Sequence, residues 1–497
     1  MAVVIYCIIA FIVIYIINYY RNVSKYPKGP TPLPLIGNLL MVDHGNLHNY
    51  LADLSKTYGP IYSLFMPSPT VVITDYEYLK EAYVKQGENF SGRTNRPPDN
   101  LLQKFECTGV LWSDGEVWKE NRRASLKILK DFGLGKKLME EQIIGSIREM
   151  LTQLRDTEDK KCIDLYLSIQ LCVGNVINEN LFGYHYSYKN AQKFEKFVAI
   201  LSKHVQLKRG NPCLQIVQTY PWLKCLPIIG YKGYYAIREN IDSYQKFMEK
   251  EVNELMAKYD PHHEPENFVH AYMREMEQTK GNTTLNKMNL IATCVDFWLA
   301  GMETTSVTLR WAIIYMLQNP GVQEKVRSEI IKQIGNDRLP TMNDRQSMPY
   351  TQAMLHETQR FANLVATPPT HRCQEETMLI DKKIPKDTFV FAMFGSIMND
   401  KRVFSEPEKF IPERYLNEDG VTFNKTLLDH TIPFGMGKRI CAGEGMARME
   451  LFLVFTSLIQ NYEIRSHEPI DSIPIYGSVL HPKRFNVEIV PINNNEL

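Results

Sequence analysis

Residues 434–445 read FGMGKRICAGEG and set one cysteine, Cys441, on a turn that holds four glycines. Arg439 lies two positions before the cysteine. The segment after it, 446–459, has the composition of a good helix, so the thiol is expected near a positive helix end. A lone thiol in such a place is either a nucleophile, which needs a nearby His, Asn or Asp partner, or a metal ligand. A third interpretation is an ordinary glycine-rich turn with a buried cysteine.

The composition argues against several classes of function. The chain has 497 residues and a formal net charge of +1, which disfavours nucleic acid as the main partner because phosphate binding needs a basic excess. Its nine cysteines are widely spaced and form no C-x-x-C pair. This spacing disfavours structural zinc, c-type haem attachment and a dithiol redox site. It indicates free thiols in a reducing compartment, most of them small core residues.

The amino terminus has the properties of a membrane anchor. Residues 2–17, AVVIYCIIAFIVIYII, carry no charge, and with the next three residues they approach the roughly 20 residues that span a bilayer as a helix. No basic region precedes them and no small-x-small cleavage site follows, which disfavours a cleaved signal peptide. Arg21, Lys25 and Lys28 come next, and positive flanks prefer the cytoplasmic side. We therefore predict a transmembrane anchor helix over 1–20 and a cytosolic catalytic domain.

A proline-rich linker is predicted over 21–35. The stretch YPKGPTPLPLIGN, residues 26–38, holds four prolines and two glycines and cannot continue a helix. The prolines favour a stiff, extended connector between membrane and domain.

Helical patterns dominate the remainder, with a minor β region. β-like runs occur at 61–66, 70–75, 377–380 and 388–394, and the clearest helix, 285–318, is apolar almost all round, which suits a helix buried through a core. The prediction is a mainly α fold with a minor sheet near one edge, and one globular domain over 36–497.

A metal ligand is the interpretation of Cys441 that the rest of the chain favours. One cysteine without companion cysteines fits haem iron held by a single axial thiolate. The four glycines would let the backbone approach a flat macrocycle, and Arg439 would pair with a haem propionate.

The cysteine turn resembles a motif of a known family. FGMGKRICAG (434–443) matches the F-x-x-G-x-R-x-C-x-G motif of the cytochrome P-450 family, the haem-thiolate monooxygenases, and the similarity continues in order over nearly the whole chain. It looks closest to the microsomal, drug- and lipid-metabolising animal members. The resemblance implies the cytochrome P-450 fold, haem b as cofactor and Cys441 as its metal ligand.

The motif AGMETT, 300–305, carries the implied catalytic pair. By resemblance Thr304 is the hydroxyl that steers protons to iron-bound dioxygen, with Glu303 beside it. A carboxylate and a hydroxyl in an apolar helix need a reason, because burying them unpaired is costly. The alternative is a kinked core helix whose hydroxyls bond back to carbonyls, and both can be true.

Two motifs resemble the family's structural lock. Glu357 and Arg360 of ETQR lie one helical turn apart, and Arg414 of FIPERY follows downstream. In the family these three hold the loop that leads to the cysteine. Tyr415 stands where the family usually has Phe. Taken alone, E-x-x-R most often means a solvated ion pair.

Further residues resemble contacts to the haem propionates. Trp118 and Arg122 of WKENRR share a helix face at i and i+4, and Arg93 and His371 match other contacts more loosely. Plain packing is the alternative for Trp118, and a solvated loop is the alternative for Arg93 and His371.

A cationic set lies along this helix and the cysteine turn. It resembles the face that docks an acidic reductase, NADPH-cytochrome P-450 reductase, with cytochrome b5 as a possible second partner. A solvated face is the alternative. Its members are Lys119, Arg123, Lys127, Lys130, Lys136, Lys137 and Lys438.

The implied reaction uses dioxygen and NADPH electrons from a separate flavoprotein, since no G-x-G-x-x-G follows a strand here. The substrate is expected to be a small hydrophobic molecule such as a xenobiotic, fatty acid or steroid, in an apolar pocket. Core packing is the alternative role for each residue of the implied lining. The lining comprises Phe105, Phe297, Ala300, Val365, Ala366 and Val479.

The implied location is the endoplasmic reticulum membrane, with a single span and contact with membrane lipid. Four N-x-S/T sequons, at Asn22, Asn89, Asn282 and Asn424, would then stay unmodified. Three other functions remain open: a peroxide isomerase of the same fold that needs no reductase, a haem sensor or carrier without turnover, and a cysteine hydrolase.

Overall fold

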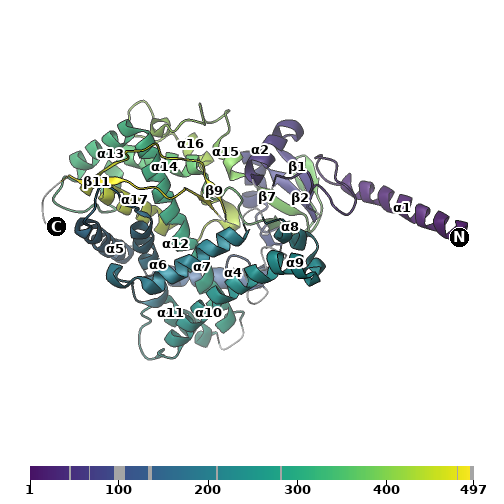
Figure 1. The fold of residues 1–497 in the computed structure, drawn as a ribbon, viewed down its shortest axis with the longest axis horizontal. Coiled ribbons are helices and arrows are strands. Elements are labelled where there is room, and N and C mark those ends of the chain that lie inside the picture. Colours follow the sequence, from purple (N-terminus) through teal and green to yellow (C-terminus); the bar gives the residue numbers. More distant parts are fainter. Residues whose placement is uncertain are drawn as a thin grey trace.

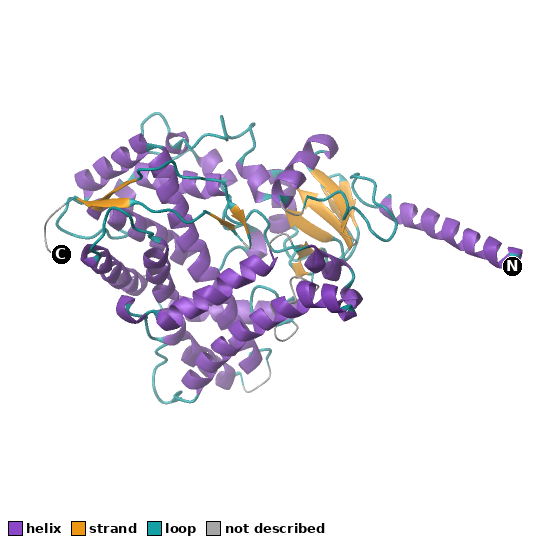
Figure 2. Ribbon diagram, in the orientation of Figure 1, coloured by secondary structure: helices purple, strands orange, loops and turns teal. Residues whose placement is uncertain are grey.

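Most of the chain is helical in the computed structural model (Figure 2), as the sequence predicts. The structure describes residues 1–43, 46–66, 68–94, 107–132, 137–208, 211–279, 283–477 and 479–492. Phe105, Lys136 and Asn282 lie outside these ranges.

The helices run the length of the chain and enclose the core (Figure 1). Short 3₁₀ and π segments connect several of them. The α-helices are α1 Ala2–Val23, α2 Leu47–Tyr58, α3 Tyr76–Lys80, α4 Gly115–Asp131, α5 Lys137–Asp156, α6 Tyr166–Phe182, α7 Gln192–Lys208, α8 Pro212–Thr219, α9 Pro227–Gly230, α10 Ala236–Met256, α11 Phe268–Gln278, α12 Lys287–Gln318, α13 Pro320–Gln333, α14 Pro349–Ala362, α15 Phe394–Met398, α16 Lys425–His430 and α17 Glu444–Asn461.

Helix α12 passes through the core, which confirms the long helix predicted over 285–318. The side chain of Asn286 caps it by accepting a hydrogen bond from the backbone of Asn289. Gly301 lets α12 approach α6, because a Cβ there would lie 3.1 Å from Ile177. Trp298 and Trp311 are each only 2% exposed, so α12 is buried in apolar surroundings on both sides of its midpoint.

The largest sheet joins segments that are far apart in sequence, in the order β1-β2-β7-β4-β3. Strands β2 and β7 are parallel, with Thr70 opposite Phe389, and the other pairs are antiparallel. The strands of this sheet are β1 Ile61–Met66, β2 Ser68–Ile73, β3 Gly92–Arg93, β4 His371–Arg372 and β7 Phe389–Ala392.

The predicted second β patch is confirmed only in part, because its two runs belong to different sheets. Strand β7 joins the early strands, whereas β5 pairs with β6 in a separate hairpin. Two further pairs lie near the carboxyl end. The remaining strands are β5 Thr377–Leu379, β6 Lys382–Ile384, β8 Tyr462–Arg465, β9 Ile475–Tyr476, β10 Leu480–His481 and β11 Glu488–Pro491.

The amino-terminal helix α1 projects from the end of the molecule that holds the large sheet (Figures 1 and 2). None of its residues is buried. Among the described helices it is the one long and apolar enough to cross a membrane. It continues three residues past the predicted limit of 20 and ends at Val23.

The linker does not form the extended connector that its prolines suggested. Leu33 and Gly37 exchange backbone hydrogen bonds of 2.9 and 2.7 Å, which fold the linker back on itself. The carboxamide of Asn38 donates to Pro30 O at 3.2 Å and accepts from Phe65 N at 2.9 Å. These contacts pack the linker against β1, so it positions the anchor relative to the body.

Candidate active site

The turn that carries Cys441 is closed by two glycines with positive φ, Gly435 at 72° and Gly437 at 77°. A Cβ on Gly437 would lie 1.8 Å from Tyr83 O, in the π-helix η1 Glu81–Lys85, so only glycine fits. The turn is therefore pressed against η1. Close approach of these glycines to a flat macrocycle, which the sequence suggests, stays a prediction.

The Cys441 side chain is exposed, and α17 begins three residues after it. Burial by the surrounding protein raises the pKa of the thiol, and hydrogen bonds from the backbone N–H groups of Gly443 and Glu444 lower it. The two descriptions are compatible, because a side chain in a recess can touch solvent and still be surrounded by protein. The N–H groups suit a sulfur that carries negative charge.

Arg439 lies beside this turn and contacts three backbone carbonyls. Its guanidinium donates to Ser91 O at 3.0 Å, Val110 O at 3.2 Å and Ser113 O at 2.7 Å. Burial, and next the charge of Arg93, lower its pKa to about 8. The site therefore places a cation where its charge is disfavoured unless an anion joins it.

Helix α4 supplies Trp118 and Arg122 on one face, as predicted. Arg122 donates to Ile440 O at 2.5 Å and so holds the residue before Cys441. The Trp118 ring lies 3.9 Å from the Arg439 guanidinium carbon. Its indole Nε1–H is buried and has no hydrogen-bond partner among the described residues. An unpaired buried donor costs about 1–3 kcal/mol, which indicates an acceptor that the protein itself does not supply.

Strands β3 and β4 bring Arg93 and His371 to the same place as paired neighbours. The Arg93 side chain is 4% exposed and donates to Leu111 O at 3.0 Å and Pro369 O at 3.1 Å. His371 Nδ1 lies 2.7 Å from Phe90 O, and the ring stacks on Tyr83 with centroids 4.1 Å apart. Burial, and next Arg93, lower the His371 pKa, so this imidazole is neutral.

These donors fit an anionic cofactor. Within the described ranges, Arg122 and Arg439 make no ion pair and bind backbone carbonyls instead. The described part of the chain contains no group of three or more His, Cys, Asp or Glu that could hold a metal ion. One accessible thiol beside buried cations and an unpaired indole N–H suits haem, whose porphyrin supplies the other iron ligands and whose propionates are anions.

Glu303 and Thr304 are neighbours on α12 but bind different groups. The Thr304 hydroxyl donates to Ala300 O at 2.7 Å, as the kinked-helix alternative expects. The Glu303 carboxylate accepts from Gln170 of α6 at 3.2 Å and lies 3.3 Å from His481 Nδ1 of β10. Burial raises the Glu303 pKa to about 7, against the lowering effect of the Arg310 charge.

The Glu357–Arg360–Arg414 lock has the expected geometry. Arg360 Nε donates to Glu357 at 2.7 Å, and neither side chain is exposed. Arg414 Nε donates to the same carboxylate at 3.1 Å, and so does Ile411 N at 2.9 Å. The Tyr415 hydroxyl, an addition relative to Phe, lies 2.7 Å from the Thr431 hydroxyl, so its polar end is satisfied.

The residues expected to line a substrate pocket differ in their environments. Ala300 is exposed although it lies in the middle of α12. Ala366 and Val479 are buried, at 2% and 7% exposure, and Val365 is half-buried beside them. Phe297 packs edge-to-face on Phe268 of α11, with centroids 5.7 Å apart.

The described members of the cationic set are partly neutralised. Lys438 pairs with Glu88 at 3.0 Å, and Lys119 pairs with Glu116 at 3.1 Å. Lys127 pairs with Glu275, and Lys137 lies 3.7 Å from a carboxylate. Arg123 and Lys130 form no ion pair with the described residues.

Sequence reasoning missed several polar residues around the site. Asp296 of α12 accepts from the backbone N–H groups of Val110 and Leu111 at 2.7 and 2.9 Å, and so fixes the segment before α4. The carboxylate of Glu450 in α17 is fully buried, and burial raises its pKa to about 8 against the lowering effect of the Thr305 hydroxyl. The sequence signal that could have identified both residues is a carboxylate inside an otherwise apolar helix pattern.

Comparison with known proteins agrees with these observations. The family model for cytochrome P450 matches residues 27–489. Cytochrome P450 2H2 of Gallus gallus is 35% identical over 488 residues, 96% of each chain. Cytochrome P450 2C25 of Mesocricetus auratus is 36% identical and cytochrome P450 2C8 of Homo sapiens 35% identical, each over 478 residues and 94% of both chains.

Proposed function

This chain belongs to the cytochrome P450 family and is a haem-dependent monooxygenase; from that premise we propose its ligand, electron source and substrate class. Cys441 is the thiolate ligand of haem iron. NADPH supplies the electrons through a separate flavoprotein reductase. One oxygen atom of dioxygen enters a small hydrophobic organic substrate, a xenobiotic, fatty acid or steroid.

The observation that carries the proposal is the set of unmatched donors around the cysteine turn. The thiol of Cys441 is accessible and receives two backbone N–H groups. The buried indole N–H of Trp118 lacks an acceptor, and burial disfavours the charge of Arg439. Haem would answer each of these needs at once, because it would offer iron to the thiolate and propionate acceptors to the cations and the indole.

Bound haem supplies dioxygen binding and cleavage, and a thiolate ligand favours that cleavage. The protein supplies proton handling. Thr304 Oγ1 gives its own hydrogen to Ala300 O, which leaves the oxygen lone pairs able to accept from a water or an acid. Glu303, with a pKa near 7, holds an exchangeable proton one residue away on the same helix.

The substrate pocket is proposed to include the apolar residues predicted from the sequence. Ala300 supplies an accessible apolar surface on α12, and Val365 and Val479 come together in one cluster from two separate loops. Ala366 follows Val365 in the chain and is buried. Phe297 lies on α12 and packs against Phe268 of α11. These side chains exclude water and leave the choice of substrate to shape, since each methylene contributes only about 1–3 kcal/mol of discrimination. Phe105 stays a prediction outside the described residues.

The location proposed is the endoplasmic reticulum membrane, with a single span and a cytosolic domain. Helix α1 gives the span. A second apolar surface around α8 and α9 exposes Trp222 and Ile228 by 67% and 72%. It lies at the same end of the molecule as α1 (Figure 1), and Tyr220 OH donates to Leu35 O at 2.5 Å. Both features support contact of one end of the body with lipid.

The electron donor is proposed to dock on the cationic face along α4 and the cysteine turn. Arg123 and Lys130 keep their charge available there, because no described carboxylate pairs with them. An acidic reductase, or cytochrome b5 as a second donor, would be steered toward this face.

The test is the absorption spectrum of the reduced protein with carbon monoxide. A strongly red-shifted Soret band is expected, since that shift needs a thiolate opposite the gas. Cys441→Ser and Cys441→His should lose the shift while keeping the fold, as far-ultraviolet circular dichroism would check. Intact protein that binds haem without the shift would end the assignment of Cys441.

Turnover separates the remaining functions. Product formed with NADPH, reductase and dioxygen supports the proposal. Product formed with peroxide and never with NADPH and reductase would indicate the isomerase. Bound haem without any turnover, unchanged by Thr304→Ala, would indicate a sensor or carrier, and activity in a haem-free preparation would indicate the hydrolase.

A further inference from the structure

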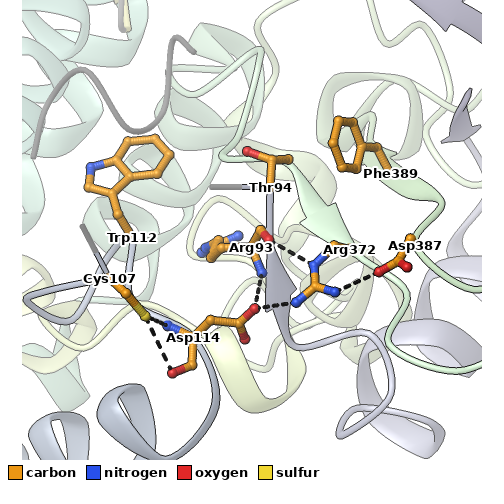
Figure 3. A pocket seen from close by; sticks show the side chains of 8 residues that line it. All are labelled: Arg93, Thr94, Cys107, Trp112, Asp114, Arg372, Asp387 and Phe389. Atoms are coloured by element: carbon orange, nitrogen blue, oxygen red, sulfur yellow. Dashed lines mark hydrogen bonds and ion pairs between the residues drawn. The ribbon is translucent and has the colours of Figure 1, made fainter. Parts of the chain in front are cut away.

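Three charged side chains form a group at the edge of the large sheet, beside the proposed haem site. Figure 3 shows Arg372 of β4 between Asp114 and Asp387. Its guanidinium donates to Asp114 Oδ2 at 2.6 Å and to Asp387 Oδ1 at 2.7 Å. The Asp114 side chain is 18% exposed and that of Asp387 61%. Asp114 is thus the inner partner, and Asp387 the outer one.

The inner pair holds the backbone of Arg93 from both sides. Asp114 Oδ2 accepts from Arg93 N at 3.3 Å, and Arg372 Nε donates to Arg93 O at 3.0 Å (Figure 3). Asp387 has no such contact with Arg93 in the described structure. Arg93 borders a cavity of about 440 Å³ on this side, which the same three charged residues also line.

Each partner belongs to an element that carries a residue of the haem site. Asp114 is the N-cap of α4, which bears Trp118 and Arg122, and its Oδ1 accepts from Gly115 N at 2.8 Å. Arg372 follows His371 on β4. The Asp114–Arg372 pair therefore fixes α4, β3 and β4 to one another at the point where their donors converge.

The way Asp114 contacts Arg93 matters for the charge of the site. The carboxylate takes the backbone N–H of Arg93, whereas the guanidinium donates to backbone carbonyls. Asp114 also raises the pKa of the buried Arg439, which Arg93 and Arg122 lower. The carboxylate thus offsets part of the cationic field around Arg439.

We propose that Asp114 and Arg372 are positioning residues for the haem propionates, acting through the backbone of Arg93 and the start of α4. The proposal rests on the proposed haem function. It assigns the pair two effects. The pair holds the propionate donors in place, and its two charges set the electrostatic potential at the haem edge with opposite signs.

The test uses haem-bound full-length protein with Asp114→Asn and Arg372→Gln. Asn keeps an oxygen for Gly115 N, so the α4 cap survives while the charge is lost. Transfer of haem to excess apomyoglobin should become about three- to tenfold faster in both variants, the value of one hydrogen bond of about 1 kcal/mol. The haem reduction potential should rise in Asp114→Asn, which loses a negative charge, and fall in Arg372→Gln, which loses a positive one.

Matched controls come from the same chain. Asp387→Asn makes the same chemical change as Asp114→Asn on a carboxylate that does not touch Arg93. Arg402→Gln removes another arginine that bridges two carboxylates, Asp75 at 2.8 Å and Asp400 at 2.5 Å, with 72% side-chain exposure. Both controls should keep wild-type haem transfer and potential. Arg372→Lys keeps the positive charge but loses the guanidinium geometry that bonds two partners. The haem reduction potential of this variant should therefore stay near wild type, while haem transfer becomes faster.

The outcomes distinguish this inference from the function on which it rests. Failure of the wild-type protein to bind haem through a thiolate would overturn the proposed function itself. Haem bound normally, with Asp114→Asn and Arg372→Gln both matching Asp387→Asn in transfer rate, would overturn the positioning role. If the haem reduction potential shifts in the same direction in both variants, the Asp114–Arg372 pair has only a structural role, and the electrostatic effect is overturned.

Discussion

At the scale of single residues, one nitrogen carries much of the argument for a cofactor. Trp118 Nε1 is buried and has no hydrogen-bond partner among the described residues. The residue is 4% exposed, and its ring stacks on the Arg439 guanidinium. A protein that needed only packing there would have no use for the indole N–H. The indole is therefore expected to matter for haem rather than for the fold.

Trp118→Phe should separate the two roles. Removing the unpaired donor relieves about 1–3 kcal/mol, and the smaller ring costs a similar amount in lost packing, so the free energy of unfolding of the haem-free protein should change by less than about 1 kcal/mol. Haem transfer to apomyoglobin should become about tenfold faster.

Trp298→Phe is the control, because Trp298 is buried against Phe197, with centroids 4.0 Å apart. It should lower the free energy of unfolding without changing the haem transfer rate. Equal haem retention in wild type and Trp118→Phe would contradict the assignment.

Glu303 predicts a pH dependence. Its pKa of about 7 means that the folded protein holds a proton there which the unfolded chain releases above its ordinary pKa of 4.5. The contribution of this proton to stability is complete below about pH 4.5 and is lost as the pH rises to about 7. Over the same upper range, product formed per NADPH consumed should fall as the acid is ionised.

Glu303→Gln should flatten both profiles relative to wild type. The comparison has to be made as a difference, because Asp296 and Glu450, whose pKa values are also raised by burial, titrate in both proteins. Parallel profiles in the two proteins, in thermal unfolding and in turnover, would contradict the role given to Glu303.

The sequence predicts single residues well where a motif encloses them. Resemblance to family motifs singles out Cys441, Trp118 and Arg122, and spacing along one helix places Trp118 and Arg122 on the same face. Their roles toward haem stay predictions. The partners of Glu303 could not be singled out, because Gln170 and His481 lie 133 and 178 positions away and only the fold brings them to α12.

At the scale of elements, the lock of α14 depends on full burial. Glu357 and Arg360 are both 0% exposed, and Arg414 is 6% exposed. Removing one charge from such a group leaves the others unpaired in the interior.

Glu357→Ala should therefore lower the free energy of unfolding by about 3–5 kcal/mol, enough to leave little haem-bearing protein in the cell. Lys56→Ala, which breaks an exposed pair with Asp53 at 77% and 68% side-chain exposure, should cost no more than about 1 kcal/mol. Denaturant unfolding compares the two, and similar costs would show that the lock is dispensable.

Elements were predictable where the pattern is local. A continuous apolar run gives α12 within two residues of its observed start, and β1 at its observed bounds. Sheet membership was not predictable, because the pairing of β2 with β7 joins Thr70 to Phe389. Strand β5, at 377–379, was predicted from the same kind of apolar run as β7. It pairs with β6, the next strand in the chain, because a short turn connects the two.

At the scale of the whole molecule, two apolar regions are proposed to hold the protein on lipid. Exposed side chains such as Trp222 and Ile228 contribute about 1.5–3 kcal/mol each when covered. Removing residues 1–23 should therefore weaken binding to phosphatidylcholine vesicles without abolishing it. Adding Trp222→Asp and Ile228→Asp should release the protein fully in flotation assays.

Aspartates placed at two exposed neutral positions away from this surface, Ala257 and Gln333, provide the charge control and should leave the shortened protein bound. A protein shortened by residues 1–23 that is already fully soluble would show that α1 alone holds the membrane.

The sequons report the orientation. With a cytosolic domain, Asn89 and Asn424 should stay unglycosylated in cells, so endoglycosidase should not change the mobility of the protein on gels. Both side chains are engaged in the fold, Asn89 through Glu375 O at 3.0 Å and Asn424 as the cap of α16. A mobility shift lost in Asn424→Gln would place the domain in the lumen.

The join between α1 and the body has a kinetic consequence. Tyr19 and Tyr20 donate to Leu33 O and Pro32 O at 3.1 and 3.3 Å. The ring centroids of Tyr26 and Phe65 lie 5.4 Å apart. These contacts restrict rotation of α1 relative to the body. Once α1 is inserted, the body can drift and spin about one axis but cannot tumble. Collisions with another membrane-bound protein then depend on its number per unit area, and diluting the vesicles leaves their frequency unchanged while adding lipid lowers it.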